Sequence, residues 1–184
     1  MSSSLFVVDV GRCTGCNACT IACKDRAGLP DGLDFLRIER IESGLYPNVD
    51  MYYRVMHCFH CEKPPCVDVC QTEAISKKDD GFVHLVVENC DNCGKCKDVC
   101  PFDSIIELPE GFHSKCDGCY DEVNNGWAPA CVRACLMRAL SFKPINEVDL
   151  VSYRIEKDFR DSGIRPSVIY IRNKQNAGIH ENRK

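Results

Sequence analysis

The chain has 184 residues, its formal net charge is −4, and its 45% hydrophobic content includes 16 cysteines. The negative charge leaves no basic footprint for nucleic acid, and no stretch approaches the roughly 20 apolar residues that a membrane span needs. Without the cysteines the apolar content is thin for this length, so we expect something besides hydrophobic burial to help hold the fold.

The first residues, MSSSLFVVDVGRC, contain no basic n-region, no long apolar h-region and no twin arginine. We therefore expect no export signal in this chain and favour the cytoplasm, a reducing compartment in which disulfides are unusual. The alternative is export together with a partner that carries a twin-arginine signal.

The cysteines form an internal repeat of four groups of four. Every group opens with CxxC and closes with CxxxC, while the middle gap is two residues in the first and third groups, four in the second and eleven in the fourth. Insertions therefore occur only where a loop can lengthen without disturbing the outer pairs.

Disulfides, zinc and iron-sulfur clusters are the three interpretations of such a repeat. Disulfide frameworks are typical of secreted chains, and zinc is usually held by two CxxC pairs that converge on one ion, where a third nearby cysteine has no place. A cubane has four irons at separate corners, so a CxxCxxC loop can give one thiolate to each of three irons. Residues 90–101 match the bacterial CxxCxxCxxxCP pattern at every defined position. The sequence therefore favours four [4Fe-4S] clusters, with iron bound through all sixteen cysteines.

In that bacterial pattern the fourth cysteine of each group binds the other cluster of a pair. Groups two and three are close in sequence and form one pair, nested inside a pair made of groups one and four. The ligand sets predicted in this way are Cys13, Cys16, Cys19 and Cys135 for cluster 1; Cys116, Cys119, Cys131 and Cys23 for cluster 2; Cys58, Cys61, Cys66 and Cys100 for cluster 3; and Cys90, Cys93, Cys96 and Cys70 for cluster 4.

Secondary structure around these groups is expected to be modest. Residues 6–13 predict a strand that runs into the first ligand loop, and residues 82–90 predict another. Residues 34–58 contain two strands joined through SGLYPN (43–48), which indicates an inserted hairpin. Residues 96–108 predict a short helix followed by a strand.

Near the C-terminus, residues 146–163 have apolar residues at helical spacing, with Asn146 as candidate N-cap and Gly163 as the stop. Residues 167–173 then predict a strand, and residues 174–184 form a polar tail, either disordered or lying on a partner.

These elements predict an α+β fold with two nested bacterial-ferredoxin-like units, each with two [4Fe-4S] clusters. Residues 1–30 with 110–146 form the outer unit and residues 57–109 the inner unit. Residues 31–56 are the inserted β-hairpin, which we expect to contact a partner, and residues 147–184 hold the C-terminal helix, strand and tail.

Some residues outside the cysteine set invite further assignment. His57 and His60 lie in the second group, but because the cysteine set is complete we expect them to act behind the ligands or at the surface rather than to bind iron. Trp127, Tyr52 and Tyr53 are interpreted as core or interface residues. No catalytic residue is predicted.

The chain resembles the four-cluster electron-transfer subunit of the dimethyl sulfoxide reductase family. The resemblance rests on VVDVGRCTGCNACTIACK, YYRVMHCFHCEKPPCVDVC, CDNCGKCKDVCP and WAPACVRAC, and it extends to the YPNV hairpin and the terminal GIRPSVIYIRN. It covers nearly the entire chain. It does not specify the substrate, because similar subunits serve reductases of dimethyl sulfoxide, polysulfide, thiosulfate and arsenate, formate dehydrogenases and a transhydroxylase.

The resemblance implies that the chain is not catalytic itself and carries single electrons to or from a large catalytic subunit with a molybdenum or tungsten bis-pterin cofactor. It implies that cluster 1 is nearest that subunit, followed by clusters 2 and 3, and that cluster 4 meets a membrane quinol subunit or a soluble carrier. The alternatives are a related subunit of a hydrogenase, carbon monoxide dehydrogenase or formate-hydrogen lyase complex, a free-standing polyferredoxin, and a zinc-bearing interaction protein.

The chain departs from the family pattern after two closing cysteines. Proline often follows the last cysteine of the second and fourth groups, but here Gln71 and Leu136 stand there. Each replacement adds a backbone N–H, so the sequence predicts an extra donor near a cluster sulfur and a raised potential.

Overall fold

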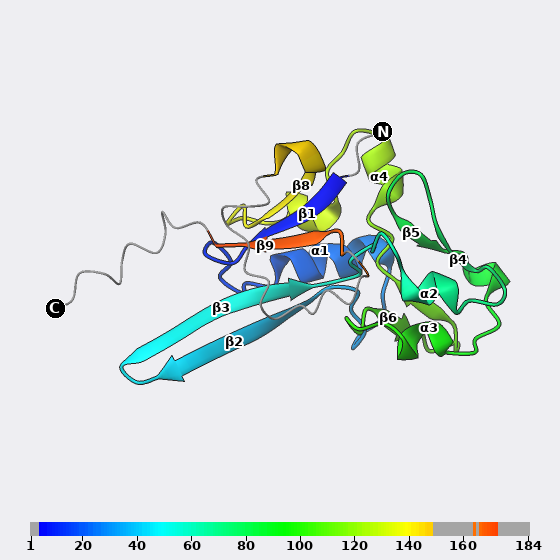
Figure 1. Cartoon of the computed structure of the whole chain (residues 1–184), viewed down its shortest axis with the longest axis horizontal. Coiled ribbons are helices and arrows are strands. Elements are labelled where there is room, and N and C mark those ends of the chain that lie inside the picture. The colour runs from blue at the N-terminus through cyan, green and yellow to red at the C-terminus, as the bar shows by residue number, and fades with distance from the viewer. Residues whose placement is uncertain (1–3, 149–163, 165, 173–184) are drawn as a thin grey trace.

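The computed structural model describes residues 4–148, 164 and 166–172. Short helices and short strands alternate along these residues, which confirms the predicted α+β class. Figure 1 shows a long two-stranded ribbon extending from one side of the molecule, while the short helices and hairpins between residues 65 and 115 gather at the opposite end. Among the helices within these ranges, none has both the length and the apolar character needed to cross a membrane.

A three-stranded sheet joins the beginning of the described chain to its end. Strand β1 (Ser4–Asp9) lies in the middle, pairs antiparallel with β8 (Leu140–Pro144) and parallel with β9 (Val168–Ile171). Strand β1 is almost wholly buried, as its run of apolar residues requires for a central strand. Because β1 leads into the first cysteine group and β8 follows the fourth, this pairing brings those two groups together.

The ribbon in Figure 1 is an antiparallel hairpin of β2 (Arg37–Leu45) and β3 (Asn48–Met56). Its turn contains Tyr46, and this tip is strongly exposed, with Leu45 at 84% and Tyr46 at 92%. At the other end of the hairpin Val55 is only 1% exposed and packs in the core. The hairpin is therefore anchored at its base and open to contacts at its tip.

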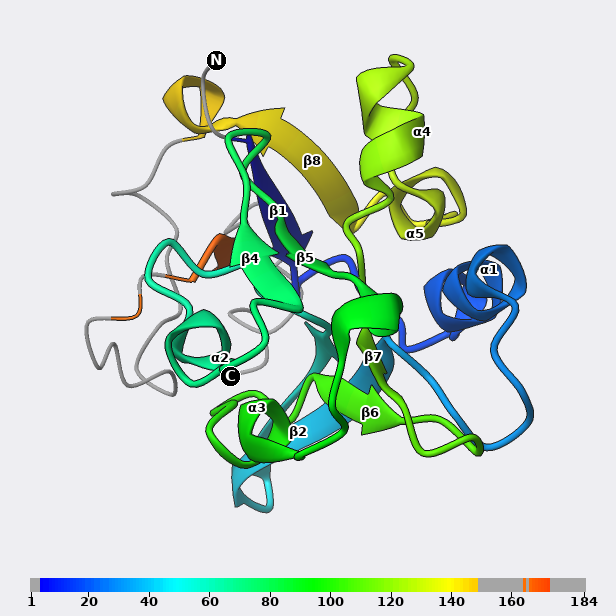
Figure 2. The same ribbon diagram turned by 90° about the vertical axis from the view of Figure 1, so that its right-hand side faces the viewer.

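The opposite end of the molecule is a structural repeat. Helix α2 (Pro65–Asp68) and hairpin β4 (Ile75–Lys77)–β5 (Val83–Leu85) recur thirty residues later as helix α3 (Lys95–Asp98) and hairpin β6 (Ile105–Glu107)–β7 (His113–Lys115), with a 3₁₀ turn at Val87–Asn89 between them. The two hairpins have equivalent register. Figure 2 looks onto this end and shows α2 and α3 next to each other beside their hairpins.

Three further helices complete the part of the chain that the structure describes. Helix α1 (Ala18–Ala27) follows the first CxxC pair and packs against α5 (Ala130–Arg133), and α4 (Tyr120–Asn124) lies within the long gap of the fourth group. Helix α1 ends because Gly28 is left-handed, with φ 60°, and its N–H donates back to the Asp25 carbonyl.

The core has two parts, and the larger one contains several aromatic side chains. Within the repeat region the rings of Phe59 and Phe102 stack with centroids 4.1 Å apart, and the ring of Phe59 also lies 6.2 Å from that of Tyr170 in β9, which links this region to the three-stranded sheet. The smaller part holds Ile75, Val83 and Ile105 from the short hairpins, packed with Cys66 and Cys96. Cysteines belong to both parts, so the ligand-bearing segments and the core are one structure.

Several of the predicted elements are present in the described residues. Strand β1 corresponds to the strand expected over 6–13, β5 to the one over 82–90 and β9 to the one over 167–173. Helix α3 and strand β6 correspond to the helix and strand expected over 96–108. Asn146 belongs to a 3₁₀ turn, Ile145–Glu147. Most of the helix expected over 146–163, from residue 149 onward, and the tail expected over 174–184 lie outside the described residues.

Candidate metal centres

A short helix carries the third cysteine of each group. Cys19, Cys66, Cys96 and Cys131 lie in α1, α2, α3 and α5, and all four are buried. Helices α2, α3 and α5 end before the fourth cysteine of their groups, whereas α1 continues past it. In three of the groups, therefore, the chain is free to turn away after the third cysteine.

The CxxC loops share one backbone feature. In every group the residue directly before the second cysteine has a positive φ, a conformation that turns the chain sharply and lets successive N–H groups face an anion. These residues are Gly15 (φ 69°), His60 (φ 44°), Asn92 (φ 60°) and Gly118 (φ 74°). Glycine, which adopts a positive φ without steric cost, supplies this conformation in the first and fourth groups, whereas His60 and Asn92 supply it in the second and third.

Two of these glycines are also required by close packing. A Cβ at Gly15 would lie 2.6 Å from the ring of Tyr53, and one at Gly118 would lie 2.2 Å from the ring of Phe82. Hairpin β2–β3 thus covers the first ligand loop, and the segment leading into β5 covers the fourth.

The repeat region contains two cavities lined by cysteines. One has about 350 Å³ of empty space and is lined by Cys58, Cys61, Cys66 and Cys100. The other has about 320 Å³ and is lined by Cys70, Cys90, Cys93 and Cys96. Each cavity thus receives three cysteines from one group and the fourth from the neighbouring group, the same combinations as the sets predicted for clusters 3 and 4.

A third cavity lies where the outer sheet brings groups one and four together. It has about 300 Å³ of empty space and is lined by Cys13, Cys16, Cys19 and Cys135. The backbone N–H of Asp9 donates to the Ala139 carbonyl at 2.8 Å, which extends the β1–β8 pairing up to the two cysteine groups. These are the residues of the set predicted for cluster 1.

The remaining four cysteines are Cys23 from α1 and Cys116, Cys119 and Cys131 from the fourth group. Burial raises the pKa of Cys116 and of Cys131, and in both cases the charge of Cys23 raises it further. Burial likewise raises the pKa of Cys23 to about 12, with Cys119 adding to the rise. Because such coupling falls off with distance, these four thiols lie near one another, and Cys19 and Cys58 of the neighbouring sets lie near them too.

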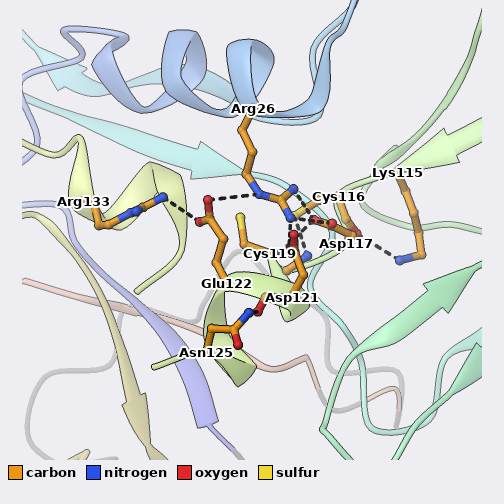
Figure 3. A network of polar contacts seen from close by, with 10 residues as sticks. Arg26, Lys115, Cys116, Asp117, Cys119, Asp121, Glu122, Asn125 and Arg133 are labelled. Atoms are coloured by element: carbon orange, nitrogen blue, oxygen red, sulfur yellow. Dashed lines mark hydrogen bonds and ion pairs between the residues drawn. The ribbon is translucent and has the colours of Figure 1, made fainter. Parts of the chain in front are cut away.

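An ion-pair network holds α1 against this last set (Figure 3). The guanidinium of Arg26 donates to both oxygens of Asp117, at 3.1 and 3.0 Å, and pairs with Asp121 and Glu122. On the other side of the network, Arg133 donates to Glu122 at 2.6 Å. The side chain of Arg26 is only 19% exposed, so this network joins α1, α4 and α5 in a partly desolvated place.

Three buried thiols of these cavities resist ionisation in the protein alone. Burial raises the pKa of Cys19 to about 11 and that of Cys61 and Cys66 to about 12, and neighbouring cysteines add to each rise. A thiolate is the form that binds metal, so a bound cation would stabilise the ionised form of these buried sulfurs.

Backbone donors to the closing cysteines differ from the expectation. Burial would raise the pKa of Cys70, but donors from Ile75, Thr72 and Ala74 outweigh it and lower the pKa. Ala139 N–H donates to Cys135 Sγ at 3.2 Å. The N–H groups that donate to these two sulfurs therefore come from residues two to five positions further along the chain, and not from Gln71 or Leu136. The turn after each helix brings the donating residues back over the sulfur.

The donor set and the cavities fit a polynuclear cluster. Within the described residues, no group of three or more His, Cys, Asp or Glu side chains is arranged to hold a single metal ion. Instead, in each of the three cysteine-lined cavities four sulfurs line a common space rather than converge on one point. Four separate thiols around such a space suit a cubane with an iron at each of four corners.

The two histidines of the second group are fully enclosed rather than at the surface. His57 and His60 are each 2% exposed, and the His57 ring nitrogen Nδ1 lies 2.7 Å from the Cys58 carbonyl. The Val83 N–H donates to His60 Nδ1 at 3.0 Å. Burial lowers the pKa of His57 to about 4 and that of His60 as well, so both rings are neutral and support the ligand loop through hydrogen bonds and packing.

The aromatic residues divide between packing and exposure. Tyr53 packs on the first ligand loop, and Tyr52 packs against the larger core with Arg172 over its ring at 5.1 Å. Trp127 is 62% exposed, with Arg133 over its ring at 5.7 Å, and thus does not belong to the core.

Two residues that sequence reasoning missed line the cavities of the repeat region. His113 lines the cavity of Cys90 and is 5% exposed, and Lys115 lines the cavity of Cys58 and is 4% exposed. The sequence offers no signal for Lys115, because the burial that sets it apart from an ordinary surface lysine arises only in the folded chain.

Comparison with known proteins agrees with this chemistry. A family model described as a 4Fe-4S dicluster domain matches residues 49–145, and one described as a 4Fe-4S binding domain matches residues 11–27. The sequence is 40% identical over 152 residues to a component of the anaerobic dimethyl sulfoxide reductase of Escherichia coli K12, covering 78% of this protein and 74% of that relative.

More distant relatives are components of other complexes. One from the sulfite dehydrogenase of Allochromatium vinosum is 31% identical over 172 residues, covering 81% of this protein and 72% of that relative. One from the selenate reductase of Mesobacillus selenatarsenatis is 26% identical over 207 residues, covering 91% and 71%.

This protein belongs to the iron-sulfur subunits of the dimethyl sulfoxide reductase family. As a member of this family it is an electron-transfer subunit with [4Fe-4S] clusters and is not catalytic on its own. The cysteine cavities are the places in this family member where such clusters can bind.

Proposed function

We propose that this chain relays single electrons through four [4Fe-4S] clusters to or from a large catalytic subunit with a molybdenum or tungsten bis-pterin cofactor. The observation that carries the proposal is the lining of the three cavities, each of which combines three cysteines of one group with the fourth of another. When bound, a [4Fe-4S] cluster accepts and releases one electron at a time.

The proposed ligand sets use every cysteine once. The cavities support Cys13, Cys16, Cys19 and Cys135 for cluster 1, Cys58, Cys61, Cys66 and Cys100 for cluster 3, and Cys70, Cys90, Cys93 and Cys96 for cluster 4. The electrostatic coupling supports Cys23, Cys116, Cys119 and Cys131 for cluster 2.

These sets imply two nested units, as the order of the groups predicts. The repeated helices and hairpins support an inner unit over 57–109, and the β1–β8 pairing supports an outer unit of 1–30 with 110–146. The long hairpin within 31–56 is an insertion whose exposed apolar tip serves partner contact. The segment 147–184 contributes β9 to the three-stranded sheet.

The protein contributes ligands, enclosure and charge to this relay. Buried thiols favour the neutral form until iron binds, so metal loading and folding are coupled. Backbone N–H groups that donate to sulfurs, such as Gly118 to Cys116 at 3.4 Å, offset the negative charge that the thiolates bring.

The catalytic subunit is proposed to dock at cluster 1. Cys16 is exposed, and Met137, which lines the same cavity, is 43% exposed. Leu136 beside it is 83% exposed and Ile21 is 64% exposed, so apolar side chains surround a site that lies near the surface. At the other end, cluster 4 passes electrons to a membrane quinol subunit or a soluble carrier, as the open position of Cys93 supports.

The first experiment counts the metal. Anaerobic purification of the chain with its co-purifying large subunit should yield sixteen irons and sixteen inorganic sulfides per chain, with paramagnetic resonance signals of four reduced clusters. A zinc protein, or far fewer than sixteen irons, would refute the proposal.

The second experiment tests the docking site. Leu136→Glu should weaken co-purification of the large subunit at least tenfold with the iron content unchanged, because it puts a charge into an apolar contact. The matched control is Val86→Glu, which puts the same charge on a 42% exposed apolar residue of the inner unit and should still co-purify with the large subunit. Equal loss in both variants, or loss in neither, would exclude this docking surface.

A further inference from the structure

The two cavities of the inner unit are sister sites whose linings differ at several positions, and Lys95 and His113 line the cavity of Cys90. One of these differences lies in the equivalent hairpins. Residues thirty apart occupy equivalent places: Ile75 pairs with Leu85 at the start of one hairpin, and Ile105 pairs with Lys115 at the start of the other. Ile75 and Leu85 line the cavity of Cys90, and Ile105 and Lys115 line the cavity of Cys58. A cation thus occupies in one cavity the place that an aliphatic side chain occupies in the other.

Lys115 is enclosed and bound to neutral oxygens. It is 4% exposed, and its amine donates to the carbonyls of Val83 and Cys116, the latter at 3.0 Å. Among the described residues, no carboxylate forms an ion pair with Lys115. A buried charge is costly unless an opposite charge compensates it. An anion in the adjoining cavity would compensate the charge of Lys115.

One thiol of the cavity, Cys66, lies close enough to Lys115 for the two charges to interact. Burial and Cys58 raise the pKa of Cys66, and the ammonium of Lys115 offsets part of this rise. The second cation of the neighbourhood, Lys77, donates to the carbonyls of His60 and Gly81 at 2.7 Å and does not line the cavity. Lys115 is thus the cation placed to act on whatever these four sulfurs hold.

We propose that the buried ammonium of Lys115 raises the reduction potential of the cluster held by Cys58, Cys61, Cys66 and Cys100. In the sister cavity Leu85 occupies the equivalent place, and the cation there is Lys95 from the ligand loop. One-electron reduction adds one negative charge at the cavity and takes up no proton. A fixed ammonium in a medium of low dielectric stabilises the more negative state. The inference rests on the ligand sets proposed above.

The test is a redox titration of the purified complex with dithionite, followed by paramagnetic resonance. Lys115→Met, which keeps the length and removes the charge, should lower the midpoint potential of this cluster by about 59 mV or more, a tenfold change in a one-electron equilibrium. Lys115→Arg keeps the charge and should shift it much less. Leu85→Met is the matched control at the sister cavity and should shift neither cluster.

The reciprocal variant and the iron content separate the outcomes. Leu85→Lys should raise the midpoint potential of the sister cluster. An unchanged midpoint in this variant, or loss of its sister cluster, would overturn the proposal. This variant decides the matter even where Lys115→Met does not load iron. A Lys115→Met protein with sixteen irons and an unshifted midpoint would overturn it as well, as would equal shifts in Lys115→Met and Lys115→Arg. Fewer than sixteen irons in the unaltered complex would instead refute the proposed ligand sets.

Discussion

Gly118 is the position where one added methyl group should most disturb the fourth ligand loop. Its φ of 74° lies in the left-handed region, where an alanine costs about 1–2 kcal/mol. A Cβ there would also lie 2.2 Å from the ring of Phe82. That ring is 3% exposed and stacks on Phe142 with centroids 5.8 Å apart, so it has little room to move.

The overlap adds to the backbone cost. Overpacking of a well-filled core costs about 1–3 kcal/mol, so Gly118→Ala should destabilise the protein by about 2–5 kcal/mol in total. The matched control is Gly126→Ala: Gly126 has φ 83° but no atom within 4 Å of an added Cβ, so it carries the backbone cost alone. The difference between the two variants therefore isolates the contact with Phe82.

The assay is the rate at which visible iron-sulfur absorbance is lost in a fixed concentration of guanidinium under anaerobic conditions. Cluster loss is irreversible, so a rate is the appropriate measure of stability. Gly118→Ala should lose absorbance faster than Gly126→Ala, and adding Phe82→Leu should narrow the gap because it shortens the obstructing side chain. The reasoning is refuted when Gly118→Ala and Gly126→Ala lose their clusters equally fast.

Two further predictions concern the network and the metal. Arg26→Met should destabilise the protein by about 1–3 kcal/mol and hasten cluster loss, because it leaves Asp117 without its cation. Arg26→Lys should restore only part of the stability, since an ammonium cannot pair bidentately. The control is Lys24→Met, which breaks a 3.6 Å ion pair with Asp34 and should change the rate of cluster loss little. Anaerobic removal of iron should abolish the near-ultraviolet circular dichroism, since cysteines belong to both parts of the core, and an unchanged spectrum would contradict the coupling of metal loading to folding.

Most of the candidate metal ligands could be predicted from the spacing of the cysteines along the chain. The CxxC and CxxxC pairs lie within single loops and helical turns, so their geometry depends on dihedrals that neighbouring residues largely set. This is why the sequence predicted the short strands before the ligand loops and the helix at Lys95–Asp98. The same reasoning did not anticipate His60 and Asn92 in the left-handed position, because those residue types adopt it only where the surrounding structure demands it.

Reasoning from a single missing proline was less successful. Gln71 and Leu136 do carry the added N–H groups, but the donors recorded on the Cys70 and Cys135 sulfurs come from residues further along. The direction of a backbone N–H depends on the path of the following turn, and residue identity alone does not specify that path.

The sequence by itself determined that this protein has sixteen cysteines in four repeated groups, which family it resembles and which chemistry those groups suit, because ligand spacing is a property of a few consecutive residues. Only the tertiary structure decided what surrounds the sulfurs: the β1–β8 pairing that joins groups one and four, the enclosure of His57 and the place of Lys115 beside one cavity but not its sister. Those features join residues far apart in the chain, and burial and charge compensation between distant segments arise only when the chain packs.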